Sequence, residues 1–482
     1  MKIYYTSDVH GYFYPTDYLD KDFKSTGLLC CANNYKKDEN TLIIDGGDIL
    51  QGSAFDYYLS KNKGSKHIAE IMSMVGVDYF TLGNHDFNYG YDYLKEYLLN
   101  HSGKCICANV VDKKNILPIY DHEIIEIDGK KIGIIGVVTD WINLWEKEEN
   151  LINFEIKNSF ESAKIAFEKI KDTDYKICIY HGGYEIDLDT LNKNSNTDEN
   201  VGAKIAKEMD IDLLLTGHQH MSVENKNIYN THTLQPPSNA SEYMQINIDL
   251  NNNTTTSKLE KPNEKPRKDI YDKFLYIEEE VQKYLDTTIA TLDKDYLPSE
   301  KLDMAINGSE LADFINKIQL SVSKADISIT SFANEIKGFT KNITVRDVLT
   351  TYRFPNTLTV LEINGKNLRL ALEKNYSYIE FENNEFKISD KYLHPKVEHY
   401  NFDFFYNLDF EIDLKKEIGN RIGKINFKNK EIKDDDKLSI VMNNYRSSGA
   451  GDFPMYKESK VLQMINMEVS EIIIDYLESH YN

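Results

Sequence analysis

The sequence predicts an α/β protein with two large domains, of which the first is a β-sandwich with flanking helices. The chain has 482 residues, which is more than one hydrophobic core usually organises. In its first half, short apolar, β-branched runs alternate with segments of helical periodicity. A second alternation follows a long amphipathic helix expected at 269–286. Layers of strands and helices around two separate cores account for both patterns.

The elements of the first domain are expected in a regular order. Five strands, each ending just before a polar cluster, are expected at 2–7, 41–45, 79–82, 176–180 and 213–216. Helices are expected at 65–74, 91–100, 159–171 and 198–208. A hairpin around Asp128-Gly129 is expected to join 119–127 to 131–138, and strands at 228–235 and 243–250 are expected to close the domain. The polar stretch 251–256 has nothing to bury and is expected to be an exposed loop.

The chain is expected to divide into a first domain at 1–265, a linker helix region at 266–300 and a second domain at 301–482. The run Glu278-Glu279-Glu280 in the linker helix is expected to face solvent.

The second domain is predicted to be an α/β unit of its own. Ser309 is a predicted N-cap for a helix at 310–320, and Thr344 with Asp347 forms a predicted capping box. Strands are expected at 326–330 and 357–363. An Asn364-Gly365 turn and a helix from Lys366 are expected next.

Composition and charge exclude some classes of function. The formal net charge is −22, which opposes non-specific binding to nucleic-acid polymers or to an anionic membrane. The sequence has no run of about 18 apolar residues and no secretory signal pattern, so we expect a cytoplasmic protein. The five cysteines lie in apolar segments, and we expect reduced core residues and not disulfides.

Five polar clusters directly follow the expected strands of the first domain. They are Asp8-Val9-His10, Gly47-Asp48, Gly83-Asn84-His85-Asp86, His181-Gly182-Gly183 and Gly217-His218-Gln219-His220. Loops beyond strand ends converge at one edge of such a domain, where ligands usually bind. Each cluster alone has a simple structural explanation, but five in this order favour a shared site.

The residue types in these clusters predict a site for two divalent metal ions. Two ions about 3.5–4 Å apart can clamp the attacking and leaving oxygens of a phosphoryl transfer. Asp48 is the natural bridging ligand, because each carboxylate oxygen can hold one ion. Imidazole and carbonyl ligands suit manganese, zinc or iron, and the lack of cysteine argues against a closed structural zinc site.

In this order the clusters resemble the motifs D-x-H, G-D, G-N-H-[DE], H and G-H-x-H of the calcineurin-like metallophosphoesterase superfamily, and of its nucleotidase branch in particular. The resemblance covers almost the whole chain. It implies an N-terminal metallophosphoesterase β-sandwich and a C-terminal 5′-nucleotidase-type α/β domain that binds the nucleotide. It implies one ion held by Asp8, His10, Asp48 and His220, and a second held by Asp48, Asn84, His181 and His218. His85 is implied to be the catalytic histidine, not a metal ligand.

Asn88 distinguishes two groups within this branch. The 5′-nucleotidases read G-N-H-E-F-D, and their last aspartate pairs with the catalytic histidine. Here the phrase ends in Asn88 and resembles the N-H-[DE]-F-N-Y-G of the 2′,3′-cyclic-nucleotide 2′-phosphodiesterase/3′-nucleotidases. An aspartate would raise the pKa of His85, whereas an amide only orients the ring. We therefore favour the cyclic phosphodiesterase group.

Two aromatic phrases in the second domain resemble the family's base-binding segments. Tyr445, which precedes the small-residue loop of the phrase 443–454, is the first candidate for stacking on a base. Tyr400 is the candidate partner ring, with Phe405 as its competitor. Asp452 is a candidate acceptor for a ribose hydroxyl. The arginine phrase of the 5′-nucleotidases has no counterpart at 331–335, which again disfavours that group.

The sequence-based hypothesis is therefore the hydrolysis of nucleotide phosphoesters, with His85 and Asn88 as the catalytic pair and a small nucleotide as substrate. The alternatives are a 5′-nucleotidase or nucleotide-sugar hydrolase with the same metals, and a catalytically silent nucleotide-binding protein. The metal identity, the preferred base and the oligomeric state stay open.

Overall fold

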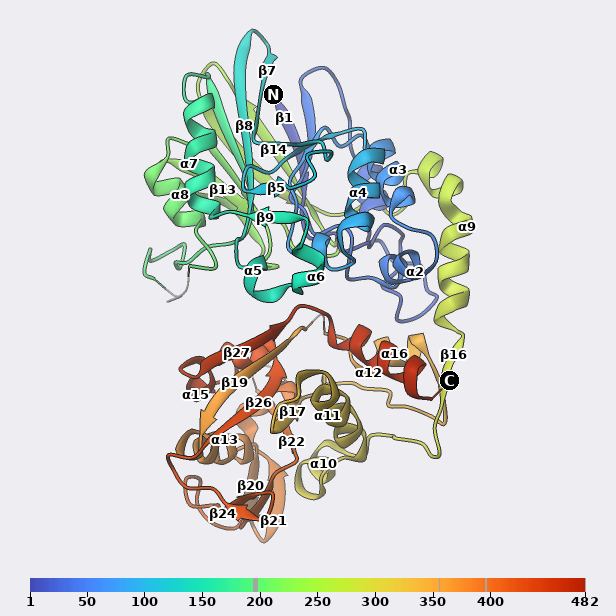
Figure 1. The fold of residues 1–482 in the computed structure, drawn as a ribbon, viewed down its shortest axis with the longest axis vertical. Coiled ribbons are helices and arrows are strands. Elements are labelled where there is room, and N and C mark those ends of the chain that lie inside the picture. Colours follow the sequence, from blue (N-terminus) through green and yellow to red (C-terminus); the bar gives the residue numbers. More distant parts are fainter. Residues whose placement is uncertain (194–197, 355, 395–396, 482) are drawn as a thin grey trace. The chain divides into compact units, whose positions relative to one another are not determined.

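The computed structural model describes residues 1–193, 198–354, 356–394 and 397–481 (Figure 1). It divides the chain into two compact units, 1–283 and 284–482. Within the described ranges, no helix has the length and apolar character needed to cross a membrane.

The first unit contains two large mixed sheets. The seven-stranded sheet has the order β15 (Thr254–Glu260), β14 (Tyr243–Asp249), β1 (Lys2–Thr6), β2 (Thr41–Asp45), β3 (Tyr79–Phe80), β4 (Lys104–Ile106), β6 (Ile119–Tyr120). The six-stranded sheet has the order β12 (Val223–Ile228), β13 (Thr231–Gln235), β11 (Leu213–Thr216), β10 (Tyr175–His181), β8 (Lys130–Val138), β7 (His122–Ile127). The two short strands β5 (Val110–Asp112) and β9 (Phe154–Ile156) pair with each other.

The two sheets pack face to face. Their shared core includes Ile3 and Ile44 from the seven-stranded sheet, and Ile134, Ile177 and Leu215 from the six-stranded sheet. Helices α7 (Ser159–Ile170) and α8 (Gly202–Glu208) cover the outer face of the six-stranded sheet through a second core. The first unit is thus a β-sandwich with flanking helices (Figure 1), as predicted.

The remaining helices of the first unit vary in length. They are α1 (Leu28–Ala32), α2 (Ala54–Asn62), α3 (Lys66–Val75), α4 (Tyr91–Asn100), α5 (Ile142–Trp145), α6 (Glu148–Leu151), α9 (Lys268–Leu285) and the 3₁₀ turn η1 (His85–Phe87). Helix α4 packs on β3 through Tyr97 and Phe80, whose ring centroids lie 5.8 Å apart.

Parallel pairing aligns the strand ends that matter for the site. Strands β1, β2 and β3 run parallel to one another, as do β8, β10 and β11. The polar clusters lie at or just beyond the carboxyl ends of β1, β2, β3, β10 and β11, so the fold gathers them at one edge of the sandwich.

The second unit is built on a five-stranded sheet. Its order is β22 (Phe404–Tyr406), β17 (Ile327–Thr330), β26 (Lys437–Asn443), β19 (Leu358–Asn364), β27 (Lys460–Ile465). Smaller sheets are formed by β16 (Thr288–Thr291) with β18 (Asn342–Thr344), β20 (Ile379–Glu382) with β21 (Glu385–Ile388), and β23 (Asp409–Ile412), β24 (Ile422–Phe427) and β25 (Lys430–Glu431). The helices are α10 (Lys301–Asn307), α11 (Glu310–Ser323), α12 (Val345–Thr351), α13 (Gly365–Tyr376), α14 (Asn444–Ser447), α15 (Pro454–Lys457), α16 (Val469–His480) and the 3₁₀ turns η2 (Asp390–Tyr392) and η3 (His399–Asn401).

Local signals in the sequence account for several of these elements. Ser309 caps α11 by accepting from the Ala312 amide, and Thr344 with Asp347 forms the predicted capping box of α12. Asn364 is the N-cap of α13 and not part of a free turn. The five cysteines are free and buried, as predicted.

Some element predictions are wrong. The segment predicted as one strand at 119–127 is split, because β6 joins the seven-stranded sheet and β7 joins the other. Tyr229 and Asn230, with φ of 49° and 73°, turn the chain inside the segment predicted as 228–235. The stretch predicted as loop at 251–256 enters β15 at Thr254, because it pairs along β14. Glu278 is buried and accepts a hydrogen bond from Tyr18, so it does not face solvent.

Candidate metal centre

The five loops bring the predicted ligands together in two clusters. One holds Asp8, His10 and His220, and the other holds Asp48, His181 and His218, with the potential ligand atoms of each cluster within 4.8 Å of one another. Each cluster takes residues from loops of both sheets. The resemblance implies the same division of these six residues, and it adds Asp48 to the first set and Asn84 to the second.

In the first cluster, lone pairs face each other. His10 Nδ1 donates to the Gln51 carbonyl at 2.7 Å, so Nε2 of the neutral ring carries a lone pair. That atom lies 3.1 Å from Nε2 of His220, which is 3.4 Å from Asp8 Oδ1. These three potential ligand atoms lie close enough together to hold one cation.

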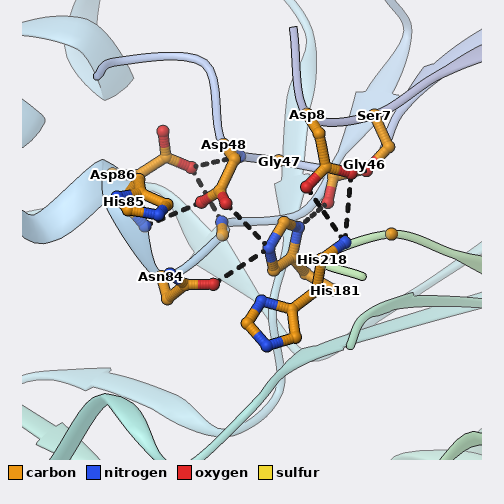
Figure 2. A network of polar contacts seen from close by, with 12 residues as sticks. Ser7, Asp8, Gly46, Gly47, Asp48, Asn84, His85, Asp86, His181 and His218 are labelled. Atoms are coloured by element: carbon orange, nitrogen blue, oxygen red, sulfur yellow. Dashed lines mark hydrogen bonds and ion pairs between the residues drawn. The ribbon is translucent and has the colours of Figure 1, made fainter. Parts of the chain in front are cut away.

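In the second cluster, potential ligand atoms also lie close together (Figure 2). His181 Nδ1 donates to the Gly46 carbonyl at 2.7 Å, which directs Nε2 towards Asp48 Oδ2 at 3.1 Å and Asn84 Oδ1 at 3.2 Å. Asp48 Oδ2 is buried and has no hydrogen-bond donor among the described residues. The other carboxylate oxygen accepts from the His85 amide at 2.7 Å. An orphaned carboxylate oxygen beside an imidazole and an amide oxygen fits a divalent ion.

The electrostatics of both clusters call for positive charge. Burial alone would lower the pKa of His181, but the Asp48 carboxylate outweighs it and raises the pKa to about 10. Burial would also lower the pKa of His220, but the hydrogen bond to Asp8 and the charge of Asp8 outweigh it and raise this pKa. Burial lowers the pKa of His10 to about 4. In both clusters the pKa is raised by the negative charge of a carboxylate, and a bound divalent ion would neutralise the same charge.

Five of the predicted ligands have a left-handed backbone. The φ angles of Asp8, His10, Asp48, His218 and His220 are 56°, 50°, 58°, 72° and 52°. Residues other than glycine rarely adopt this region, and such backbone strain concentrates at functional sites. The sharp turns redirect each side chain from its strand end towards the common edge.

Two glycines of the motifs are required for close approach of the loops. A Cβ on Gly47, whose φ is 92°, would lie 2.4 Å from the Gly83 nitrogen. A Cβ on Gly83 would lie 2.1 Å from Asp48 Oδ1. The loops after β2 and β3 therefore touch backbone to backbone beside Asp48.

Asp86 supports the Asp48 loop, a role that the sequence did not reveal. Its carboxylate accepts from the backbone amides of Asp48, Ile49, Leu50 and Gly83 at 2.7–3.1 Å. Burial, and then the charge of Asp48, raises the pKa of Asp86 to about 6 despite these donors. The fourth residue of the G-N-H-D phrase thus fixes the loop that carries the predicted bridging ligand.

His85 lies beside the first cluster and is paired as the sequence predicts. Its ring centroid is 5.3 Å from that of His10. Its Nδ1 is 2.8 Å from Asn88 Oδ1, and the Asn88 amide donates to Glu146 Oε2 at 2.8 Å. The contact of Glu146 with Asn88 was not predicted, because the two residues lie 58 positions apart.

Two further residues surround His218. Its Nε2 is 3.1 Å from Glu199 Oε1, which leaves Nδ1 as the nitrogen available to an ion. Trp145 stacks on the ring with centroids 5.3 Å apart and an interplanar angle of 18°. Neither residue belongs to a motif, and only the folded chain brings them to the site.

In the second unit, the two tyrosines predicted to bind a base are neighbours. The rings of Tyr400 and Tyr445 lie 6.2 Å apart at 76°, so they meet edge to face and not in parallel. The Tyr445 side chain is 40% exposed. Phe405 instead lies on β22 and packs against the core of the unit. The Asp452 side chain is 92% exposed and pairs with Lys374 at 3.2 Å.

A buried ion pair connects the segments of these two tyrosines. Arg446 and Asp403 are both buried and lie 2.8 Å apart. Arg446 also donates to the carbonyls of Tyr400 and Ala450 and covers the Phe453 ring at 4.3 Å. This role of Arg446 was not recognised in the sequence.

Comparison with known proteins agrees with both units. The calcineurin-like phosphoesterase family matches residues 1–222, and the 5′-nucleotidase C-terminal domain family matches residues 288–458. The chain therefore joins a calcineurin-like phosphoesterase domain to a 5′-nucleotidase C-terminal domain. It is a phosphoester hydrolase, and its family implies a divalent dimetal site.

Individual relatives are distant but extensive. A trifunctional nucleotide phosphoesterase of Bacillus subtilis is 23% identical over 99% of this chain, which spans 38% of that protein. A 2′,3′-cyclic-nucleotide 2′-phosphodiesterase/3′-nucleotidase of Haemophilus influenzae is 23% identical over 99% of this chain and 84% of its own length. A solved structure of a candidate 5′-nucleotidase from Staphylococcus aureus, in complex with α-ketoglutarate, is 28% identical, with a TM-score of 0.72 and coverage of 100% and 97%.

Proposed function

We propose that this phosphoester hydrolase acts on nucleotides as a 2′,3′-cyclic-nucleotide 2′-phosphodiesterase and 3′-nucleotidase. The observation that carries the proposal is the contact between His85 Nδ1 and the side-chain oxygen of Asn88 at 2.8 Å. An amide holds the position where the 5′-nucleotidase motif has a carboxylate, so the histidine has a neutral partner.

The relatives support the same choice by their coverage. Three proteins named as 2′,3′-cyclic-nucleotide 2′-phosphodiesterase/3′-nucleotidase are 23–24% identical over 93–99% of this chain. A protein named NAD 5′-nucleotidase and a rat 5′-nucleotidase match over 38% and 42% of it.

The residues of the first unit divide the work. Asp8, His10, Asp48 and His220 would hold one ion, and Asp48, Asn84, His181 and His218 would hold the other. Two divalent ions, with manganese, zinc or iron as candidates, supply Lewis-acid charge to a phosphate and to the attacking water. His85 keeps Nε2 directed away from Asn88, and this nitrogen would contact the phosphate or the departing 2′ oxygen.

The nucleoside side of the proposal concerns the second unit. Tyr445 and Tyr400 would stack on the base, with about 1–3 kcal/mol for each stacked base. Because the rings meet at 76°, one of them must rotate before a base can lie between them in parallel. Asp452, which pairs with Lys374 through Oδ2, would accept from a ribose hydroxyl.

A 5′-nucleotidase is the second candidate. The Staphylococcus aureus structure described as a 5′-nucleotidase aligns over the full chain at 28% identity, which favours it. The same metal ligands serve both activities, so only the substrate distinguishes them.

The proposed function is tested by phosphate release from the purified protein with added Mn²⁺, on 2′,3′-cyclic AMP, 3′-AMP and 5′-AMP. The cyclic compound is to be followed by chromatography, since its first hydrolysis frees no phosphate. We expect the cyclic compound and 3′-AMP to be hydrolysed with at least tenfold higher kcat/KM than 5′-AMP. Preference for 5′-AMP would establish the second candidate instead.

A variant shows whether the activity comes from this site. His85→Ala should lose most turnover on each compound while the metal content of the protein is unchanged, because His85 is not among the ligands. Loss of the metals together with activity would contradict its placement outside the ligand sets.

A further inference from the structure

We infer that Glu146 is a positioning residue of the catalytic site, which fixes the Asn88 amide and through it the proton-bearing nitrogen of His85. This inference rests on the proposed role of His85 in phosphoester hydrolysis. It assigns a function to a residue outside all five motifs.

The Glu146 carboxylate is held as an acceptor. Its Oε1 accepts from the Lys147 amide at 2.7 Å and from Asn150 Nδ2 at 2.9 Å. Its Oε2 accepts from Asn88 Nδ2 at 2.8 Å. Three N–H donors converge on two oxygens, so the carboxylate has a defined position and offers only lone pairs to Asn88.

This carboxylate determines which way the Asn88 amide points. An amide has a donor end and an acceptor end, and only the donor end can face a carboxylate. The acceptor end, Oδ1, must then face His85 Nδ1, at the observed 2.8 Å. Asn150 also donates to the Asn88 carbonyl at 3.0 Å, which holds the backbone at the same place.

The orientation of Asn88 in turn selects the tautomer of His85. Because Oδ1 accepts, Nδ1 of the neutral ring must carry the hydrogen, so Nε2 is the nitrogen at which the ring takes up or gives its second proton. In the 5′-nucleotidase motif a carboxylate pairs with the histidine directly. Here the Glu146 carboxylate contacts the Asn88 amide, and only this neutral amide contacts the His85 ring.

The same short segment also braces the metal cluster. Glu146 follows α5 directly, and Trp145, at the end of that helix, stacks on His218. Asn150 lies in α6. One stretch of ten residues, 141–150, thus contacts both His218 and the His85–Asn88 pair.

Two substitutions separate this role from a merely structural one. In Glu146→Gln, the new amide keeps the Lys147 and Asn150 donors on its oxygen and turns its own NH₂ towards Asn88. Asn88 must then reverse, and its NH₂ forces His85 Nδ1 to become an acceptor. In Asn88→Asp, two carboxylates face each other at a contact of 2.8 Å. Each single variant breaks the relay.

The double variant Asn88→Asp with Glu146→Gln restores every hydrogen bond, and the donor and acceptor are exchanged only between positions 88 and 146. We expect kcat to fall about 10–100-fold in each single variant, with KM changed less than threefold, and to return to within about tenfold of wild type in the double variant. A double variant no more active than the better single variant would overturn the inference. Glu149→Gln, an exposed carboxylate of α6, is the matched control and should leave kcat unchanged.

A second readout needs no turnover. The ¹⁵N shifts of the His85 ring in the Zn²⁺-loaded protein should report Nδ1–H in wild type and the double variant, and Nε2–H in Glu146→Gln. The same tautomer in wild type and Glu146→Gln would also overturn the inference. The kinetic cycle is read on whichever of the three nucleotides wild type hydrolyses best, so a preference for 5′-AMP contradicts the proposed function without touching the role of Glu146.

Discussion

At the residue scale, the site depends on backbone conformations that oppose the preference of its own side chains. Asp8, His10, Asp48, His218 and His220 all have positive φ. Each such residue costs about 1–2 kcal/mol relative to glycine. The proposed metal site would need aspartate and histidine side chains at these positions, and the surrounding packing must supply the stability that the turns lose.

His220 allows this cost to be measured. It has φ of 52° and is the predicted ligand with a 31% exposed side chain, so removing it disturbs little packing. In the metal-free protein we expect His220→Gly to be more stable than His220→Ala by about 1 kcal/mol, because alanine keeps the unfavourable Cβ. Urea unfolding followed by circular dichroism measures the difference.

His122 provides the matched comparison, since it opens the extended strand β7. There the order should reverse, with His122→Ala more stable than His122→Gly. Equal or greater stability of His220→Ala over His220→Gly would contradict the strain argument.

At the element scale, strands, helices and caps were largely predictable, whereas the supporting contacts were not. The apolar runs before Asp8, Asp48 and His218 predict strands because burial on a sheet follows from local composition. Glu146, Glu199 and Arg446 escaped prediction because nothing in their own segments indicates their partners. The hydrogen bonds from four backbone amides to Asp86 were missed for a different reason. Asp86 belongs to a motif, but the resemblance assigns roles only to its neighbours Asn84 and His85.

The end of helix α4 predicts a pH dependence of stability. His101 follows the helix, is 8% exposed, and accepts from the Gly103 amide through Nδ1 at 2.8 Å. Burial lowers the pKa of His101 to about 4. Below about pH 6.5 the unfolded chain binds a proton that the folded chain does not take up until about pH 4. The free energy of unfolding should therefore decrease as the pH is lowered from about 6.5 to about 4, by up to about 1.4 kcal/mol per pH unit.

His101→Asn tests this assignment, since its side-chain oxygen can still accept from the Gly103 amide. Urea midpoints at pH 7.0, 6.0 and 5.0 should fall less steeply for this variant than for wild type. His480→Gln, which removes a histidine near the end of α16, should keep the wild-type slope. Parallel profiles for His101→Asn and wild type would exclude His101 as a source of acid sensitivity.

At the scale of the whole molecule, the two units hold different candidate sites. The described residues of 1–283 hold both candidate metal clusters, and those of 284–482 hold the candidate base-binding tyrosines. The cytoplasmic location expected from the sequence stays a prediction. The order of the metal motifs was sufficient to predict the phosphoesterase fold, while the geometry of Tyr400 and Tyr445 depends on the buried Arg446–Asp403 pair.

Metal binding should raise the thermal stability of the first unit. A ligand at 100 times its Kd stabilises a protein by about 2.7 kcal/mol, which corresponds to about 5–10 °C for a unit of this size. Calorimetry with Mn²⁺ or Zn²⁺ against EDTA should show one transition moving and the other fixed. His181→Ala should remove most of the shift. Equal shifts of both transitions would mean that the metal does not act on this unit alone. If neither transition moved, the metal would not stabilise this unit.

Each metal cluster takes its members from both sheets of the sandwich, and this arrangement has a consequence for the life of the protein. The ions would act as reversible cross-links between the two sheets, whose loops otherwise bring carboxylate oxygens and imidazole nitrogens together at this edge. A cell deprived of the metal would then lose more than catalytic turnover. We expect the opened loops to become sites of proteolysis, so that the abundance of the protein would follow the supply of its metal.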